Sequence, residues 1–439
     1  MKVIDHLKKS EGNTLFSFEI LPPLKGTSIE GLFHSIESLM EFKPKFIDVT
    51  SHREEFVFKK HDNGLLEKIH TRKRPGTVGI CAAIQNKFKV DTVPHVICGG
   101  FTREETEYAL IDLHYLGIDN VLILRGDALK TDNQFIPETG GHKYAIDLLR
   151  QVSDLNKGAY LHDEVENTNP SNFCIGVAGY PEKHFEAPSL NSDIKYLKSK
   201  VDAGAEYVVT QMFFDNTHYF NFVNKCKEAG IHVPIIPGLK PIASKKQLTT
   251  IPRNFYLNMP DDLIRSIETA KTQAAVKEIG IEWCIEQSKE LMKNKVPVLH
   301  YYTMGKGEST ETFAQSFESR FSTAYWLAKN EMFKESRILF NNLLGESNDL
   351  QKSAVHFNLG NIYFKRALII NGPNPNVRDE ANYFFLQAKK SYIASLKLDH
   401  NHWDAKHNLD RVLRMLPEED APGVGDSDSP GLIMGNIPI

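Results

Sequence analysis

Eight short apolar runs recur along the first part of the chain, and longer amphipathic segments separate them. Each run has the length and the Val, Ile, Phe and Tyr content of a strand that is buried on both faces. The segment 102–118 is typical of the intervening ones, because its apolar residues follow helical spacing and it ends near a glycine. The runs occupy residues 15–20, 46–51, 93–98, 120–127, 173–181, 207–214, 233–239 and 296–303.

This alternation of buried strands and helices predicts an α/β fold with a parallel sheet. Eight strands over roughly 300 residues are typical of a (β/α)8 TIM barrel, and a doubly wound open sheet is the alternative. Barrel active sites lie at the C-terminal ends of the strands. Polar residues at those ends are therefore candidates, and they are Glu19, Thr50, His95, Arg125, Asp127, Tyr180, Gln211 and Asp215.

Taken singly, each of these residues has a simpler interpretation. An Asp after a strand often caps the next helix, and a lone His often serves packing. Glu19 is the most informative, because it interrupts the apolar run "LFSFEILPP". A buried carboxylate without a partner costs several kcal/mol or takes up a proton. Glu19 is therefore either functional or turned toward water.

The pattern changes after about residue 315, where strands stop and helical spacing continues to residue 416. The segments around Asn358 and Asn408 align at an offset of 50 residues, in the style of tetratricopeptide repeats. Leu359, Gly360 and Tyr363 fit the first helix of such a repeat, and Ala388 with Tyr392 fit the second. The usual unit has about 34 residues, so the excess is assigned to an insertion at 370–384. Such a module offers a groove to a protein or peptide, and a helical cap without a partner is the alternative.

The predicted organisation is thus a barrel over 1–317, a tetratricopeptide-like helical domain over 318–416 and a flexible acidic tail over 417–439. The tail holds five acidic residues and no basic one, which leaves the rest of the chain close to neutral despite a net charge of −4. Neither a nucleic-acid surface nor a polybasic membrane patch is expected.

Cysteine usage and hydropathy set the expected compartment. The five cysteines show no CxxC spacing and are odd in number, which indicates reduced thiols rather than disulfides or a zinc site. No stretch approaches the roughly 20 apolar residues of a membrane span, and the N-terminus lacks the apolar core of a signal peptide. The sequence predicts a cytoplasmic protein with neither a membrane span nor a metal site.

Common cofactor and catalytic motifs are absent from the sequence. There is no Ser-His-Asp signature, "GKGEST" lacks the spacing of a phosphate loop, and no GxGxxG follows the first strand. However, "FSFEILPP", "FIDVTS", "PHVICGG", "LRGD", "VAGYPEKHFEA", "KVDAGAEYVVTQMFFD", "PGLKPI" and "HYYTMGK" occur in this order over residues 1 to about 315. Together they resemble the bacterial-type, FAD-dependent methylenetetrahydrofolate reductases.

The resemblance implies a (β/α)8 barrel that binds FAD and tends to form homo-oligomers. It also implies a reaction in which NADH or NADPH reduces FAD and leaves, and 5,10-methylenetetrahydrofolate then accepts the hydride to become 5-methyltetrahydrofolate. The folate ring must first open to an iminium cation by protonation of its leaving nitrogen, which calls for a general acid.

The family's site residues map onto this sequence position by position. Glu19 falls on the general acid, and Asp127 on the carboxylate near flavin and pterin, where it can stabilise the cation. The alternative for Glu19 is a structural pair with a Lys or Arg. Gln211 falls on the pterin-binding amide, and Phe214 and Lys306 are expected to bind substrate. The positions that the family uses around FAD are Thr50, His95, Arg125, Gly126, Asp127, Tyr180, His184, Asp193 and Lys200.

The sequence departs from the family pattern in three places. Lys306 stands where many members have an arginine for the folate tail, and Lys240 stands where a methionine is common. The helical segment after residue 317 is not part of the bacterial enzymes. The alternative function is a tetratricopeptide adaptor carried on an inactive barrel, and the retention of Glu19, Asp127 and Gln211 argues against it.

Overall fold

The computed structural model divides into two compact units, Met1–Ala314 and Gln315–Ile439, and each is described by itself. It describes residues 1–53, 55–61, 65–129, 134–162, 167–303, 317–345, 347–370 and 375–416.

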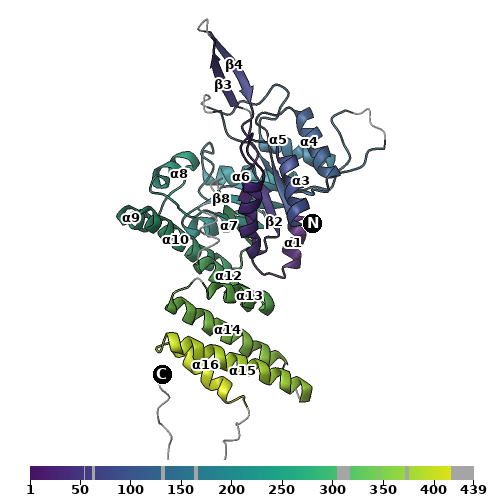
Figure 1. Cartoon of the computed structure of the whole chain (residues 1–439). Helices are drawn as coiled ribbons and strands as arrows, with labels where there is room; N and C mark the ends of the chain where they lie inside the picture. The colour runs from purple at the N-terminus through teal and green to yellow at the C-terminus, as the bar shows by residue number, and fades with distance from the viewer. Residues whose placement is uncertain are drawn as a thin grey trace, which may run out of the picture. The chain divides into compact units, whose positions relative to one another are not determined.

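The first unit is a closed barrel of eight parallel strands (Figure 1). In spatial order the strands run β1-β10-β9-β8-β7-β6-β5-β2, so each strand pairs with the next barrel strand along the chain and β10 closes on β1. The predicted TIM barrel is confirmed, and the open sheet is excluded. The strands are β1 (Leu15–Ile20), β2 (Phe46–Val49), β5 (Asp91–Ile97), β6 (Asn120–Leu124), β7 (Cys174–Gly179), β8 (Tyr207–Met212), β9 (Ile235–Leu239) and β10 (Val298–Tyr302).

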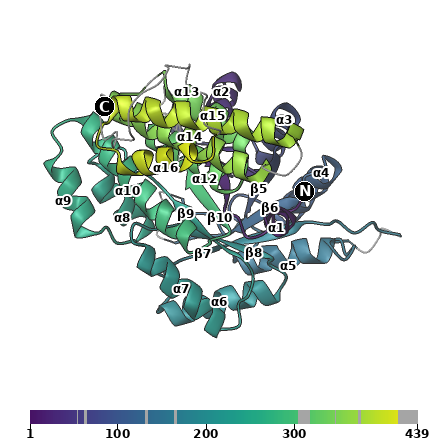
Figure 2. The same cartoon turned by 90° about the horizontal axis from the view of Figure 1, so that it is seen from below.

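Helices surround these strands (Figure 2). Local sequence explains where several of them begin: Thr102 and Glu105 form a capping box at the start of α4, and Asp215 caps α7 by accepting from the Thr217 N–H at 2.8 Å. The helices are α1 (Val3–Lys9), α2 (Glu30–Leu39), α3 (Thr77–Phe88), α4 (Arg103–Tyr115), α5 (Ala145–Leu155), α6 (Leu190–Asp202), α7 (Asn216–Glu228), α8 (Gln247–Phe255), α9 (Asp261–Thr269) and α10 (Gln273–Lys293), with a 3₁₀ turn η1 at Met40–Phe42.

The barrel interior changes from apolar to polar along its axis. An inner apolar cluster that includes Leu15, Val209 and Ile236 fills the N-terminal half. Because side chains alternate along a strand, Ser17 and Glu19 share the inward face of Leu15. Ser17 Oγ lies 2.8 Å from His300 Nδ1 across the β1-β10 pair, which marks the change to polar side chains. Apolar side chains thus fill the N-terminal half of the barrel, and polar side chains line the C-terminal half.

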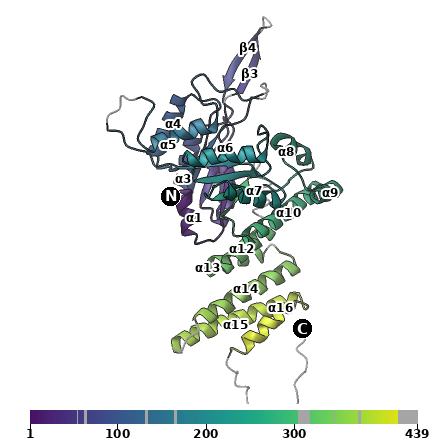
Figure 3. The same cartoon turned by 180° about the vertical axis from the view of Figure 1, so that it is seen from behind.

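An antiparallel hairpin interrupts the barrel order between β2 and α3. Its strands are β3 (Glu55–Lys60) and β4 (Leu66–Thr71), and they pair only with each other. Figure 3 shows the hairpin extending away from the barrel strands. This hairpin was not predicted from the sequence.

The second unit is helical, as predicted. It contains α12 (Phe317–Lys329), α13 (Phe333–Leu343), α14 (Asp349–Ile370), α15 (Pro375–Leu398) and α16 (Trp403–Leu413).

Close packing of α14 against α15 centres on Gly360. A Cβ at that position would lie 2.5 Å from the ring of Tyr392, so the glycine lets the two helices approach. Most of the expected insertion at 370–384 is helical, because α14 continues to Ile370 and α15 begins at Pro375. The excess length therefore lies mostly within the helix pair. The tetratricopeptide character of the helical unit stays a prediction.

Three further observations bear on the sequence expectations. All five cysteines are buried and unpaired. Among the described residues, no group of three or more potential ligands could hold a metal ion. In the same residues, no helix combines the length and the apolar character needed to cross a bilayer.

Candidate active site

The C-terminal end of the barrel brings Glu19, Asp48, His95 and Lys240 together from four strands. Strand register sets this arrangement, because Glu19 pairs with Asp48 of β2 on one side and with Tyr302 of β10 on the other. His95 Nε2 lies 3.8 Å from Glu19 Oε2 and 3.5 Å from Asp48 Oδ2. Two acids and two bases thus meet where parallel strands end.

Glu19 is held in a largely dry position, with a side chain that is 13% exposed. Burial raises the pKa of Glu19 from 4.5 to about 7, which is the dominant effect. The positive charges of His95 and Lys240 oppose the rise, and the negative charge of Asp48 adds to it. Glu19 therefore keeps its proton to near neutral pH, as a general acid must. The possibility that Glu19 points to water is excluded.

His95 and Asp48 form an ionisable pair beside Glu19. Asp48 is fully buried. Burial alone would lower the pKa of His95, but the carboxylates of Asp48 and Glu19 raise it above its ordinary value. At 3.5 Å, His95 Nε2 and Asp48 Oδ2 are an ion-pair contact and too long for a strong hydrogen bond. The buried atoms Asp48 Oδ1 and Oδ2, His95 Nε2 and His300 Nε2 have no hydrogen-bond partner among the described residues.

A separate polar cluster lies at the ends of β6 and β7 and on α6. The Arg125 guanidinium donates to both oxygens of Glu186, at 2.6 and 3.0 Å. The backbone N–H of His184 donates to Asp193 Oδ2 at 2.8 Å. Lys200 Nζ donates to the Ala178 carbonyl at 2.9 Å. This cluster gathers four of the positions that the family resemblance assigns to a flavin.

Lys200 is a buried cation in this cluster. Burial lowers the pKa of Lys200 to about 8, and the Asp193 carboxylate partly offsets the effect. An ammonium ion in such a site gains from a nearby negative charge. The Tyr180 ring meets the His184 ring edge to face, with centroids 4.8 Å apart. Burial also raises the pKa of the Tyr180 phenol well above its ordinary value, which keeps it a hydrogen-bond donor.

These residues fit a phosphate-bearing, ring-containing cofactor such as FAD. Thr50 Oγ1 is buried without a hydrogen-bond partner among the described residues, as is His95 Nε2. Gly126 turns the chain after β6 with a φ of +82°, which favours glycine. Arg125 is already paired with Glu186, so a phosphate would share this guanidinium with the carboxylate.

The remaining predicted residues are Asp127, Gln211, Phe214 and Lys306. Asp127 is exposed after β6, and its carbonyl accepts from Arg53 Nη1 at 3.5 Å. Gln211 is half-buried near the end of β8, and its Oε1 accepts from the Met212 N–H at 2.9 Å. Phe214 is 1% exposed and packs in an apolar cluster with residues of α8, α9 and α10. Lys306 lies outside the described residues.

Asp48, Lys240 and His300 belong to this end of the barrel but were not predicted. The signal for Asp48 was the one used for Glu19, a carboxylate inside the apolar run 46–51. Lys240 follows β9 directly, at the position expected of a C-terminal strand end. Its burial could be read only from the folded chain.

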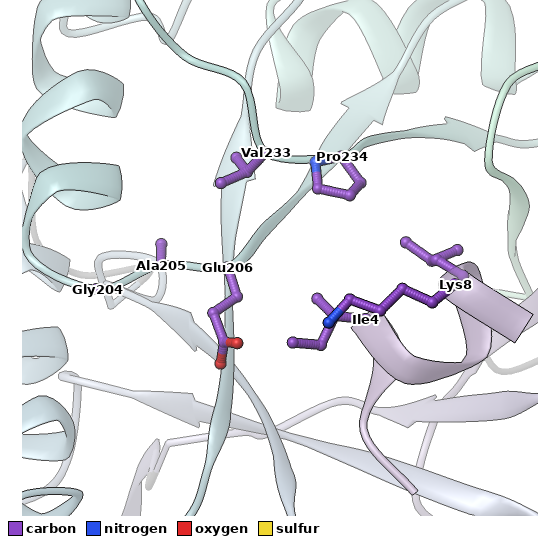
Figure 4. Close-up of a pocket in the computed structure, with 8 residues that line it drawn as sticks. Ile4, Lys8, Gly204, Ala205, Glu206, Val233 and Pro234 are labelled. Carbon is purple, nitrogen blue, oxygen red and sulfur yellow. The ribbon is translucent and has the colours of Figure 1, made fainter.

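The opposite end of the barrel has a shallow hollow (Figure 4). It lies between α1 and the segments that lead into β8 and β9, at the N-terminal ends of the strands. Lys8 and Glu206 are its only ionisable lining residues, and neither faces the groups around Glu19. Barrel chemistry is not built at this end.

Comparison with known proteins gives a consistent result. The sequence matches the family described as methylenetetrahydrofolate reductase over residues 2–317. It is 33% identical over 321 residues to methylenetetrahydrofolate reductase (NADH) 1 of Arabidopsis thaliana, which covers 70% of this chain and 49% of that protein. It is 30% identical over 308 residues to 5,10-methylenetetrahydrofolate reductase of Salmonella typhimurium, which covers 69% of this chain and 90% of that protein.

The matched lengths differ between relatives. A probable methylenetetrahydrofolate reductase (NADPH) of Caenorhabditis elegans is 31% identical over 313 residues, which covers 70% of this chain and 42% of that protein. The chain thus spans about half the length of the plant and nematode proteins that it matches. In the family comparison, the match ends where the helical unit begins.

Proposed function

The chain belongs to the methylenetetrahydrofolate reductase family, and from this premise we propose that it reduces 5,10-methylenetetrahydrofolate to 5-methyltetrahydrofolate with NADH or NADPH. One observation carries the proposal. Glu19 stands at the C-terminal end of the barrel with its pKa raised by burial to about 7. A carboxyl group that stays protonated near neutral pH is what opening of the folate ring needs.

In this mechanism Glu19 donates the proton held on its carboxyl group to the leaving nitrogen of the folate ring. The substrate then carries the positive charge of an iminium ion. The exposed carboxylate of Asp127 would stabilise this cation, and the Gln211 amide would orient the pterin by donating and accepting hydrogen bonds. For that role, Gln211 would exchange its bond to Met212 for one to the substrate.

FAD is the cofactor that the site would hold. Thr50, His95, Tyr180 and His184 would contact it, Arg125 and Lys200 would face its phosphates, Gly126 would allow close approach, and Asp193 would bind a ribose hydroxyl. Bound FAD would carry electrons from the nicotinamide to the folate. The buried cation of Lys200 and the unpartnered Thr50 hydroxyl support this assignment.

The wider assignments extend this proposal. We propose a bacterial-type enzyme that acts in one-carbon metabolism in the cytoplasm as a homo-oligomer, with Lys306 near the folate tail. The helical unit would bind a protein or peptide along its helix pairs. The adaptor function on an inactive barrel is disfavoured, because Glu19 occupies a site that gives a carboxyl group the properties of an acid.

Anaerobic stopped-flow spectroscopy of the FAD-loaded chain tests the proposal. Each nicotinamide, and then the folate, is mixed with the protein while the visible flavin absorbance is followed. Glu19→Gln is expected to leave bleaching by the nicotinamide intact and to abolish the return of colour with folate. Glu278→Gln, an exposed glutamate on α10, is the matched control. Protein that never binds FAD, or equal loss of both half-reactions in Glu19→Gln, would contradict the proposal.

A further inference from the structure

Lys240 is a buried cation beside the proton donor. The residue is 3% exposed, although lysine is almost never fully buried unless it is paired. Among the described residues, no carboxylate lies within 4 Å of its Nζ, and no hydrogen bond to it is found. Its position therefore needs an explanation other than a structural salt bridge.

Strand register places Lys240 on the level of Glu19 and on the same face. Ile236 lies in the inner apolar cluster, and alternation along β9 puts Gly238 and Lys240 on that inward side. Leu239 pairs with Tyr301 of β10, and the next residue of β10 pairs with Glu19. Glu19 on β1 and Lys240 directly after β9 are thus inward-facing residues at the C-terminal ends of the two strands that flank β10.

The charged and titratable groups that face Glu19 come from four strands. They are Asp48 on β2, His95 on β5, Lys240 after β9 and the phenol Tyr302 on β10. The positive charge of His95 is shared with Asp48 at 3.5 Å. Among the described residues, the ionisable groups that act on Lys240 are Glu19 and the Cys284 thiol of α10. Among these groups, Lys240 is the cation that is not already committed to a carboxylate.

We propose that Lys240 is a positioning residue for proton transfer, whose ammonium group stabilises the carboxylate that Glu19 becomes when it protonates the folate ring. This inference rests on the proposed function. In the step, the Glu19 O–H bond breaks and an N–H bond forms on the leaving nitrogen. Glu19 becomes an anion and the substrate a cation, while Lys240 keeps its charge and no electrons are transferred.

Removal of the Lys240 charge should have two opposite effects on the pH profile of the folate half-reaction, and these distinguish the proposed role from a packing role. Without the Lys240 charge, Glu19 holds its proton more tightly, so it should titrate at higher pH and donate its proton less readily. The rate of the folate half-reaction should therefore fall at low pH, while its basic limb moves to higher pH. A loosened core would lower the rate at every pH and leave the limb in place.

The experiment compares Lys240→Met with Lys240→Arg, which keeps the charge, and with Lys246→Met, an exposed lysine control. Infrared difference spectra against Glu19→Gln follow the protonated carboxyl band of Glu19 through a pH titration of the full chain. Lys240→Met should raise the midpoint by about one pH unit, a tenfold change in proton affinity. Lys240→Arg and Lys246→Met should match the natural chain. If Lys240→Met does not fold, Lys240→Gln replaces it with the same expectation.

Stopped-flow pH profiles of the folate half-reaction form the second readout, with the nicotinamide half-reaction as an internal control. A limb that moves with the infrared midpoint supports the proposal. An infrared midpoint that stays in place when the charge is removed overturns it, whatever the activity. If the midpoint moves but no form of the protein reduces folate, the charge pairing holds and it is the proposed function that fails.

Discussion

Glu19→Gln is expected to stabilise the barrel at pH 8 far more than at pH 5. In the folded chain burial raises the pKa of Glu19 to about 7, whereas its ordinary value is 4.5. The folded state therefore holds the Glu19 proton more tightly than the unfolded chain does. The stability that comes from this proton is fully present below pH 4.5 and is lost as the pH rises to about 7. A glutamine keeps the neutral state at every pH.

The size of the effect follows from the two pKa values. The full loss corresponds to about 3 kcal/mol, of which about 2.5 kcal/mol falls between pH 5 and pH 8. Differences in packing between Glu and Gln are the same at both pH values, so they cancel when the two stabilisation energies are subtracted. The remaining difference measures ionisation at residue 19 together with its coupling to His95 and Lys240.

Urea unfolding at the two pH values provides the assay. The fluorescence of Trp283 reports on the barrel if Trp326 and Trp403 of the helical unit are replaced by phenylalanine in every variant. The free energy of unfolding gained by Glu19→Gln should be about 2.5 kcal/mol larger at pH 8 than at pH 5. An equal gain at both pH values would refute the reasoning, because it would mean that Glu19 titrates alike in the folded and unfolded chain.

Two further predictions concern the helical unit. Gly360→Ala should destabilise that unit by about 1–3 kcal/mol, because its Cβ would push on the fully buried Tyr392 ring. Gly345→Ala is the control, because its Cβ would meet only the Asn342 carbonyl at 4.0 Å. Equal unfolding curves for the two variants would contradict this packing. Deletion of Gln315–Ile439 should leave the barrel folded, because all of its strands lie within Met1–Ala314; near-ultraviolet circular dichroism checks this, and loss of the tertiary signal would show that the barrel depends on the helical unit.

The eight barrel strands could be predicted because strands buried on both faces are continuous apolar runs. The hairpin β3-β4 was missed although a hairpin signal was present. The Asn63-Gly64 dipeptide lies between its two strands in the sequence, and this pair favours two-residue hairpin turns. Strands β3 and β4 pair only with each other and lack the continuous apolar runs of the barrel strands.

The helix boundaries around residue 372 illustrate a second limit. The insertion expected there contains Gly372, Pro373 and Pro375, and Pro375 is the first residue of α15. Proline fits the first helical position, because the N–H that it lacks would have no partner there. A proline can therefore mark the start of a helix as well as its end.

The candidate site could be predicted in part. Glu19 was identified because a carboxylate in an apolar run is costly, and the structure confirms its burial. The partners of Glu19 could not be derived in the same way. Lys240 and His95 meet it only through the closure of the barrel and the register of β9, β10 and β1, which depend on contacts distant in sequence. The prediction was thus strongest for single residues and weakest for pairs.

The reactivity of the buried cysteines can report on opening of the barrel unit. All five thiols lie in the first unit, on separate elements of the barrel, and the helical unit contains none. Burial raises the pKa of each thiol, so the reactive thiolate is scarce in the folded state. Alkylation is therefore expected to require local or global opening of the folded barrel unit. The labelling rate of each cysteine in the unmodified chain would measure opening around that residue. The helical unit adds no thiol to this signal.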